Sequence, residues 1–187
     1  DHRDLHSFPT RRSSDLLQAH HKVLSSFPNA LLILVPRHPE RFERVAGLCK
    51  REHLRLARRS RPGSYSPQTQ VYLGDTIGEL PVVIGSADVA FIGGSLVPTG
   101  GHNMLEAAAQ GVAVCFGPHV FNFAAISELL VAEGAARRVG DEVELAQQVI
   151  AWFRDATARA EAGENGRRVV RQNRGALARL IELLPLK

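Results

Sequence analysis

The stretch DVAFIGGSLVPTGGHNMLEAAAQGVAVCF, residues 88–116, decides the fold of this chain. It opens with the apolar run Val89–Ile92, which predicts a buried strand, and continues through a glycine-rich loop at 93–101 into a segment of good helix formers. Gly111 is expected to end that helix, and the apolar run 112–116 predicts a second strand. Strand, loop, helix and strand in this order form a βαβ unit, in which the two strands are parallel.

The helix of this unit is expected at 102–109, directly after the second of two glycine pairs. Parallel sheets bind ligands at the carboxyl ends of their strands, and the N–H groups of a helix that begins there favour an anion such as phosphate. The competing explanation is a tight turn that needs glycine only for its backbone angles. In the same way, His102 and Asn103 could simply be capping residues.

The composition is that of a soluble globular domain, since 44% of the 187 residues are hydrophobic and 22% are charged. The sequence contains no run long enough to cross a bilayer and no recognisable signal peptide. Cys49 and Cys115 are far apart and predict neither a disulfide framework nor a metal site, which favours a reducing compartment. The net charge is +4, but no RNA-binding strand or zinc-finger pattern accompanies it, so nucleic acid is not an expected partner.

The first sixteen residues, DHRDLHSFPTRRSSDL, differ from the rest of the chain. They are polar and rich in arginine, show no periodicity, and resemble a translated sequencing-adapter tail. We therefore expect residues 1–16 to be non-native and the folded domain to occupy residues 17–187.

Predicted strands and helices alternate along that domain. The strands are expected at 30–35, 54–60, 71–73, 89–92, 112–116 and 135–139, and the helices at 17–27, 40–53, 79–87, 102–109, 124–133, 143–153, 156–171 and 176–184. This alternation predicts an α/β domain of the Rossmann-like, doubly wound type with a mainly parallel sheet.

Several residues that follow the predicted strands are candidates for ligand binding. Pro36 and Arg37 follow the first strand in a proline-rich loop, and the planar guanidinium group suits phosphate. Ile77, Gly78 and Glu79 follow the third strand and could receive a nucleobase through backbone groups. The loop at 117–123 follows another strand end.

Glu106 lies one turn into the helix of the central stretch, where its carboxylate could accept hydrogen bonds from the two hydroxyls of a ribose. The helix dipole alone would also favour a glutamate at that position. Other site types are not indicated, because the sequence lacks the dinucleotide-binding fingerprint, the P-loop lysine, a Ser-His-Asp order and a cluster of metal ligands.

Four motifs, in this order, resemble the C-terminal half of the 3-deoxy-D-manno-octulosonic acid (Kdo) transferases. They are PRHPER at 36–41, GDTIGEL at 74–80, FIGGSLVPTGGHNMLEAAA at 91–109 and GPHVFNF at 117–123. NRGALARLIELL at 173–184 also resembles the C-terminal helix of that family, so the resemblance extends from about residue 17 to the end. These enzymes transfer Kdo from CMP-Kdo to the lipid A precursor in lipopolysaccharide biosynthesis.

The resemblance implies the donor-binding half of a GT-B-type glycosyltransferase, which consists of two Rossmann-like domains. It places contacts with CMP on nine residues: Pro36, Arg37, Ile77, Gly78, Glu79, Asn103, Met104, Leu105 and Glu106. It adds Ser95, Gly101 and His102 as candidate contacts to the phosphate or the sugar.

The resemblance also implies what this sequence lacks. In the family the catalytic base is a glutamate of the N-terminal domain, which binds the lipid A precursor and associates with the cytoplasmic face of the bacterial inner membrane. We therefore assign no catalytic residue here and expect the fragment to be soluble and inactive in transfer on its own. The implied reaction is an inverting displacement that uses neither a metal nor a cofactor.

Two other functions remain open at this point. The chain could be the donor domain of another GT-B glycosyltransferase or a sugar-nucleotide epimerase, for which a preference for UDP over CMP is expected. It could also be a non-catalytic domain whose basic surface binds an anionic membrane or nucleic acid, with a steep dependence on salt.

Overall fold

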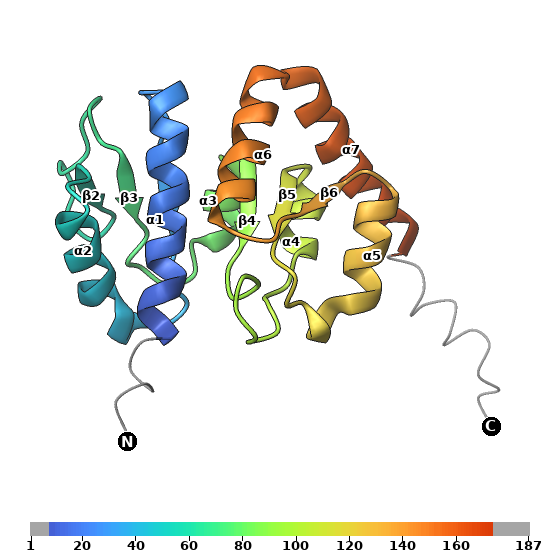
Figure 1. Cartoon of the computed structure of the whole chain (residues 1–187), viewed down its shortest axis with the longest axis horizontal. Coiled ribbons are helices and arrows are strands. Elements are labelled where there is room, and N and C mark those ends of the chain that lie inside the picture. The colour runs from blue at the N-terminus through green and yellow to red at the C-terminus, as the bar shows by residue number, and fades with distance from the viewer. Residues whose placement is uncertain (1–7, 174–187) are drawn as a thin grey trace. The chain divides into compact units, whose positions relative to one another are not determined.

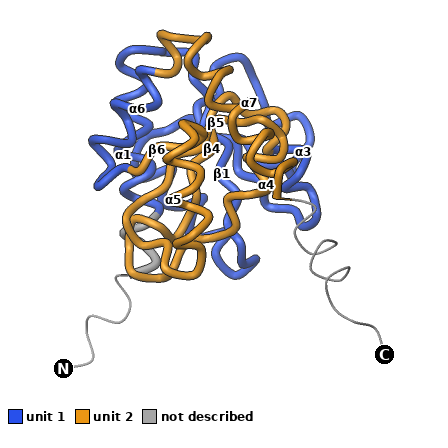
Figure 2. Tube along the Cα trace, turned by 90° about the vertical axis from the view of Figure 1, so that its right-hand side faces the viewer, with its two compact units in different colours: residues 1–83, 139–151 blue, residues 84–138, 152–187 orange. Residues whose placement is uncertain are grey.

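The computed structural model describes residues 8–173, which form parts of two compact units (Figure 2). Unit 1 contains the chain up to Val83 and then Val139–Ala151, and unit 2 contains Ile84–Arg138 and the chain from Trp152 onward. The chain passes between the units three times: within α3 (Leu80–Gly85), between Arg138 and Val139, and within α6 (Glu142–Arg154).

Unit 1 is built on a three-stranded parallel sheet with the strand order β1-β3-β2 (Figure 1). Its strands are β1 (Leu32–Leu34), β2 (Leu56–Arg58) and β3 (Val71–Leu73), and its helices include α1 (Phe8–Ser26), the 3-10 turn η1 (Pro39–Arg41) and α2 (Phe42–Arg51). Leu34 and Arg58 are both in register with Leu73, so the carboxyl ends of all three strands lie at one edge of the sheet.

The core of unit 1 forms where α1 and α2 pack against this sheet. Leu17 of α1, Cys49 of α2 and both Val71 and Leu73 of β3 are fully buried in one cluster. Burial raises the pKa of the Cys49 thiol to about 11, so this cysteine is a neutral core residue at physiological pH.

Helix α1 begins at Phe8 rather than at residue 17, and therefore extends into the segment that we expected to be non-native. Among residues 13–26 of this helix, for which burial is described, the buried residues include Leu17, Ala19 and Val23, and all lie in the part that the sequence predicted to be helical. The non-native origin of residues 1–16 stays a prediction.

Unit 2 contains a second three-stranded parallel sheet, with the strand order β4-β5-β6. Its strands are β4 (Val89–Ile92), β5 (Ala113–Phe116) and β6 (Ala136–Arg138), and its helices include α4 (Leu105–Gln110), the 3-10 turn η2 (Phe121–Phe123), α5 (Ala124–Ala132) and α7 (Ala156–Asn173). All four residues of the central strand β5 are buried, which explains its uninterrupted apolar sequence.

Helix α7 packs very closely on the segment that leads from α4 into β5. A Cβ atom added to Gly163 would overlap the carbonyl oxygen of Gly111, and one added to Gly166 would lie 3.2 Å from the backbone of Ala108. Gly111 itself ends α4 with φ 74°, in the left-handed region that favours glycine. Glycine is therefore needed on both sides of this contact.

The predicted α/β class is confirmed, and every strand expected from the sequence is present with parallel pairing. The strands form two three-stranded sheets, whereas the sequence led us to expect one. The helix predicted at 176–184 lies outside the described residues. None of the helices within residues 8–173 is long and apolar enough to cross a membrane.

We predict that Gly163→Ala destabilises the protein, because the added methyl group has no room beside Gly111. Overpacking of this kind costs about 1–3 kcal/mol, which outweighs the gain of up to about 1 kcal/mol in helix propensity. The measurement is the midpoint of thermal unfolding by circular dichroism. The control is Gly47→Ala in α2, where the nearest side-chain atom would lie 3.9 Å from the new Cβ and the midpoint should rise. A Gly163→Ala midpoint at or above that of the parent would contradict the packing described here.

We also predict that His20 makes folding dependent on pH. Burial lowers the pKa of this histidine from 6.5 to about 4, although its Nε2 lies 2.8 Å from the carbonyl oxygen of Gln70. The folded state therefore binds the proton less tightly than the unfolded chain does. Stability is full above pH 6.5 and falls between pH 6.5 and about 4, by up to roughly 3 kcal/mol.

Urea unfolding at pH 7.0 and pH 4.5 measures this difference. His20→Gln should reduce it, whereas His21→Gln, at the exposed neighbouring position, should leave it in place. An unchanged difference in the His20 variant would assign the pH dependence to other groups.

Candidate functional site

The nine predicted CMP contacts are divided between the two units. Pro36, Arg37, Ile77, Gly78 and Glu79 belong to unit 1, and residues 103–106 belong to unit 2. In both units these residues follow the carboxyl end of a parallel strand, where ligands of such sheets bind.

In unit 1 the structure brings two of the predicted segments to the same edge. Pro36 and Arg37 follow β1, and the loop at 75–79 follows β3, which is the neighbour of β1 in the sheet. The N–H of Gly74 donates to the carbonyl oxygen of Leu34 at 2.9 Å, and a Cβ on Gly74 would lie 3.1 Å from the side chain of Val35. The two strands therefore end side by side, with Arg37 exposed.

The middle of the loop is open to solvent. Ile77 is 81% exposed, and Gly78 adopts φ 87° with no atom of any residue beyond its two chain neighbours within 4 Å of the position that a Cβ would take. A flat ring could therefore approach the backbone at Gly78 without meeting another segment of the chain.

Glu79, at the end of the loop, is held by two neighbours. Its Oε1 accepts a hydrogen bond from Nη2 of Arg59 at 2.8 Å, and its Oε2 accepts one from Nε of Arg59 at 3.1 Å and another from the hydroxyl of Thr76. The hydrogen bond from Thr76 and the pairing with Arg59 together lower the pKa of Glu79, so the group is a carboxylate at neutral pH.

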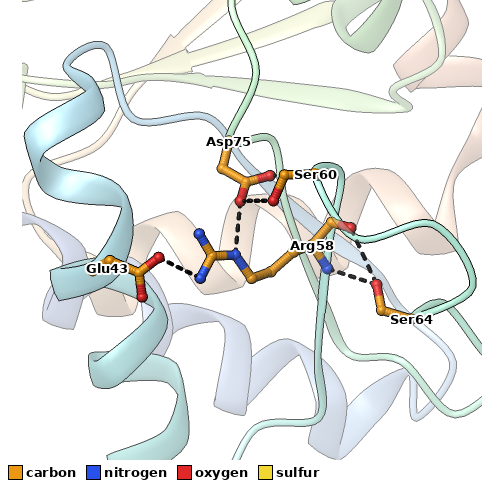
Figure 3. Close-up of polar contacts among 5 residues, drawn as sticks. All are labelled: Glu43, Arg58, Ser60, Ser64 and Asp75. Carbon is orange, nitrogen blue, oxygen red and sulfur yellow. Dashed lines mark hydrogen bonds and ion pairs between the residues drawn. The ribbon is translucent and has the colours of Figure 1, made fainter.

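The start of the loop is held by a second arginine, as Figure 3 shows. Nε of Arg58 donates to Oδ2 of Asp75 at 2.7 Å, and Nη1 of Arg58 lies 2.6 Å from Oε1 of Glu43. Ser60 donates to Asp75 twice, through its backbone N–H at 2.8 Å and its hydroxyl at 2.5 Å. The side chain of Asp75 is only 1% exposed.

The pKa of Asp75 reflects this balance. Burial opposes ionisation, but the hydrogen bonds from Ser60 and the pairing with Arg58 outweigh it and hold the pKa of Asp75 below its usual value. Asp75 is thus a buried, fully engaged carboxylate and has a structural role beside the loop.

Neither arginine was identified from the sequence as part of the site. The available signal was the pair Arg58-Arg59 towards the end of the strand predicted at 54–60, combined with the acidic residues Asp75 and Glu79 after the next strand. Opposite charges that follow neighbouring parallel strands are expected to meet, so the pairing could have been proposed.

In unit 2, the buried position of Ser95 does not fit its prediction as a contact to the phosphate or the sugar. Ser95 has no exposed surface; its hydroxyl donates to the carbonyl oxygen of Ile92 at 2.5 Å and accepts from the N–H of Gly117 at 2.7 Å. Its own carbonyl oxygen accepts from the N–H of His119. Ser95 thus joins the loop after β4 to the loop after β5, which leaves its hydroxyl buried away from any ligand at the surface.

The glycine pairs of this loop also have structural explanations. Gly94, Gly100 and Gly101 have φ values of 75°, 90° and 68°. A Cβ on Gly100 would overlap the side-chain amide of Asn122, and one on Gly101 would lie 3.2 Å from Val120. The loop therefore needs glycine for its backbone angles and for its packing on the loop after β5, and a phosphate contact at Gly101 stays a prediction.

Helix α4 starts at Leu105, three residues later than the sequence predicted. The side-chain oxygen of Asn103 already accepts a hydrogen bond from the N–H of Leu105 at 3.0 Å, the N-cap residue is Met104, and the helix has only six residues. These facts weaken the expectation that the N-terminus of this helix holds a phosphate.

Side chains offer the clearer candidates in this segment. Glu106 and Asn103 are both exposed, and Nδ2 of Asn103 lies 3.4 Å from Oε1 of Glu106. Met104 has no exposed surface and belongs to the core of unit 2, so its contact with CMP stays a prediction. His102 is exposed beside Gly94.

Among the described residues, no group of three or more His, Cys, Asp and Glu side chains could hold a metal ion. Burial raises the pKa of the Cys115 thiol to about 12, so this residue of β5 is a neutral thiol in the core of unit 2.

Comparison with known proteins gives a consistent picture, although no family model matches the chain. The 3-deoxy-D-manno-octulosonic acid transferase of Haemophilus influenzae is 43% identical over 170 residues, which cover 90% of this chain and 40% of that protein. The enzyme of the same name from Bordetella pertussis is 37% identical over 169 residues, covering 90% of this chain and 39% of that protein. The chain therefore spans about two fifths of the length of these relatives.

Among solved structures, the C-terminal CMP-Kdo binding domain of WaaA from Acinetobacter baumannii matches with a TM-score of 0.80 and 34% identity, over 85% of this chain and 83% of that domain. The C-terminal domain of a group 1 glycosyl transferase from Francisella tularensis matches with a TM-score of 0.58 and 16% identity, which shows a shared fold. By its identity to the Acinetobacter domain over most of that domain's length, together with the named relatives, the chain belongs to the 3-deoxy-D-manno-octulosonic acid transferase family and corresponds to its C-terminal domain.

Proposed function

We propose that this chain is the donor-binding domain of a Kdo transferase and that it binds CMP-Kdo. The observation that carries the proposal is the 34% identity to the solved CMP-Kdo binding domain over 83% of its length. The relatives from Haemophilus and Bordetella support the same assignment by their identity across 90% of this chain.

The edge of unit 1 supplies groups of the right chemistry for a nucleoside monophosphate. The exposed guanidinium group of Arg37 can form two parallel hydrogen bonds with phosphate oxygens. The loop at Ile77 and Gly78 offers an open backbone and an exposed apolar side chain, which suit the edge and the face of a base. The carboxylate of Glu79 adds a hydrogen-bond acceptor.

Unit 2 supplies groups for the ribose. The exposed carboxylate of Glu106 has two oxygens, each of which can accept a hydrogen bond from one of two adjacent hydroxyls. The amide of Asn103 lies beside it and restricts its orientation. Leu105 is partly exposed and can contribute beside Glu106, whereas Met104 has no exposed surface and belongs to the core.

The proposed reaction transfers Kdo from the bound donor to the lipid A precursor, within a GT-B arrangement of two domains. When the bond to Kdo breaks, negative charge grows on the phosphate of CMP, and the guanidinium of Arg37 would stabilise that charge. The base that activates the acceptor, the acceptor site and the association with the inner membrane are proposed for a longer protein of this family. Since the chain spans two fifths of its relatives, we propose that it does not catalyse transfer alone.

A different GT-B glycosyltransferase or an epimerase is the alternative that the sequence left open. The relatives from Haemophilus and Bordetella carry the Kdo transferase name, which does not favour it. The two possibilities differ in the nucleotide that the domain should prefer.

We predict that the chain binds CMP more tightly than UDP in a calorimetric titration. Arg37→Ala and Glu106→Ala should each weaken CMP binding by roughly tenfold or more, because each removes hydrogen bonds that involve a charged group. The matched controls are Arg61→Ala and Glu161→Ala, which remove the same charges from exposed positions in the same units and should leave the affinity unchanged.

A preference for UDP would favour the alternative glycosyltransferase. A folded chain that binds neither nucleotide would contradict the proposal. Equal losses of CMP affinity in the controls and in the site variants would show that the binding is only a non-specific attraction of an anion.

A further inference from the structure

We propose that Arg59 is a positioning residue of the nucleotide site, which holds the carboxylate of Glu79 and with it the loop at 75–79 in the conformation that receives the base. This inference rests on the proposed function, because it assigns to that loop the binding of a nucleobase. It concerns a residue outside the set of proposed ligand contacts.

The loop is fastened at its two ends by two successive arginines. Arg58 pairs with Asp75, the first residue of the loop, and Arg59 pairs with Glu79, the last. Arg58 is the last residue of β2 and Arg59 is the first residue of the turn that follows it, so the two neighbouring arginines reach two points that are separated along the loop. The backbone N–H of Arg59 also donates to the carbonyl oxygen of Leu73 at 2.9 Å, which anchors Arg59 to the end of β3.

Arg59 determines where the end of the loop lies. Its fork of N–H groups contacts both oxygens of Glu79, and this geometry fixes the plane of the carboxylate as well as its distance. Thr76 donates to Oε2 from within the loop, so three hydrogen bonds converge on one side chain. The backbone carbonyl oxygen of Glu79 accepts from the N–H groups of Val82 and Val83, which connects the same residue to the first turn of α3.

The middle of the loop has little packing of its own. Ile77 is 81% exposed and the space around Gly78 is open. Its conformation therefore depends on the contacts at its ends. If those contacts are lost, the loop must be ordered when the ligand binds, and the cost of that ordering is subtracted from the affinity.

The pairing of Arg59 with Glu79 is a poor candidate for a stabilising element of the whole fold. The two side chains are 48% and 38% exposed, and ion pairs at such positions contribute little to stability. A change that disrupts this pair should therefore affect ligand affinity more than unfolding. The pair between Arg58 and the buried Asp75 is expected to behave in the opposite way.

The experiment compares CMP binding by the full chain and by four variants, Arg59→Ala, Arg59→Lys, Thr76→Val and Arg61→Ala. Arg59→Ala should weaken binding by roughly three- to tenfold, and Arg59→Lys, which keeps the charge without the fork, should recover part of that loss. Arg61→Ala removes an equal charge from the segment that follows β2 and should bind as the parent does. Thermal unfolding of Arg59→Ala should stay within a few degrees of the parent.

Two further results separate positioning from simple attraction of the nucleotide. In the double variant with Arg59→Ala and Thr76→Val, the fold loss of CMP affinity should be smaller than the product of the two single losses, because both substitutions remove hydrogen bonds to the same carboxylate. Hydrogen exchange of the backbone amides at 76–79 should be faster in ligand-free Arg59→Ala than in the parent.

The inference is overturned if Arg59→Ala binds CMP as tightly as the parent, if Arg61→Ala loses as much affinity as Arg59→Ala, or if exchange at 76–79 does not change. Failure of the parent to bind CMP is a different result. It would contradict the proposed function, and the exchange measurement would still decide whether Arg59 holds the loop.

Discussion

The ion pair between Arg58 and the buried carboxylate of Asp75 is the interaction on which the ligand-facing edge of unit 1 depends. Removing one partner would leave the other charged and poorly solvated, which typically costs about 3–5 kcal/mol for a buried pair. Asp75 directly follows Gly74 at the end of β3, so its contacts with Arg58 and Ser60 fix the point at which the loop leaves the sheet. The exposed pair between Arg59 and Glu79 then sets only the far end of a loop whose start is already fixed.

In unit 2, different interactions hold the loops at the carboxyl ends of the strands. The loop after β4 is held by the buried hydroxyl of Ser95 and by glycines that allow close approach of neighbouring backbones. These interactions satisfy buried polar groups without introducing charge, which suits a loop that packs on the loop after β5. Two polar side chains of this unit that could meet a ligand lie at the surface, Asn103 just before the short helix α4 and Glu106 in its first turn.

The strands were predictable because they are short apolar runs bounded by glycine, proline or charged residues. The predicted bounds of β3 and β4, at 71–73 and 89–92, are those of the structure. The predicted start of α4 was wrong because the sequence pattern cannot show that the side-chain oxygen of Asn103 accepts the hydrogen bond of the N–H of Leu105, the first residue of the helix. Likewise, a serine in a glycine-rich loop gives no sign that it will be buried, and Ser95 was therefore interpreted as a ligand contact.

The arginine pairs were missed for a related reason. Arg59 and Glu79 are separated by 20 positions in the sequence, and their contact depends on the parallel pairing of β2 with β3. The net charge of the chain does not indicate a partner for either arginine, whereas the sheet gives each of them a particular partner. Conversely, the strand-end positions of Arg37, Ile77 and Gly78 followed from the alternation of strands and helices alone, because that order determines which residues reach the carboxyl edge.

The central claim is that CMP binds at residues that follow the carboxyl ends of the parallel strands, and amide chemical-shift mapping by NMR tests it most directly. On addition of CMP to the full chain, the account predicts that the largest shifts fall at Arg37, at 77–79 and at 103–106. The amides of α1 and of the buried strand β5 should change little. Shifts that miss these strand-end residues, or that are spread evenly over the helices, would contradict the account.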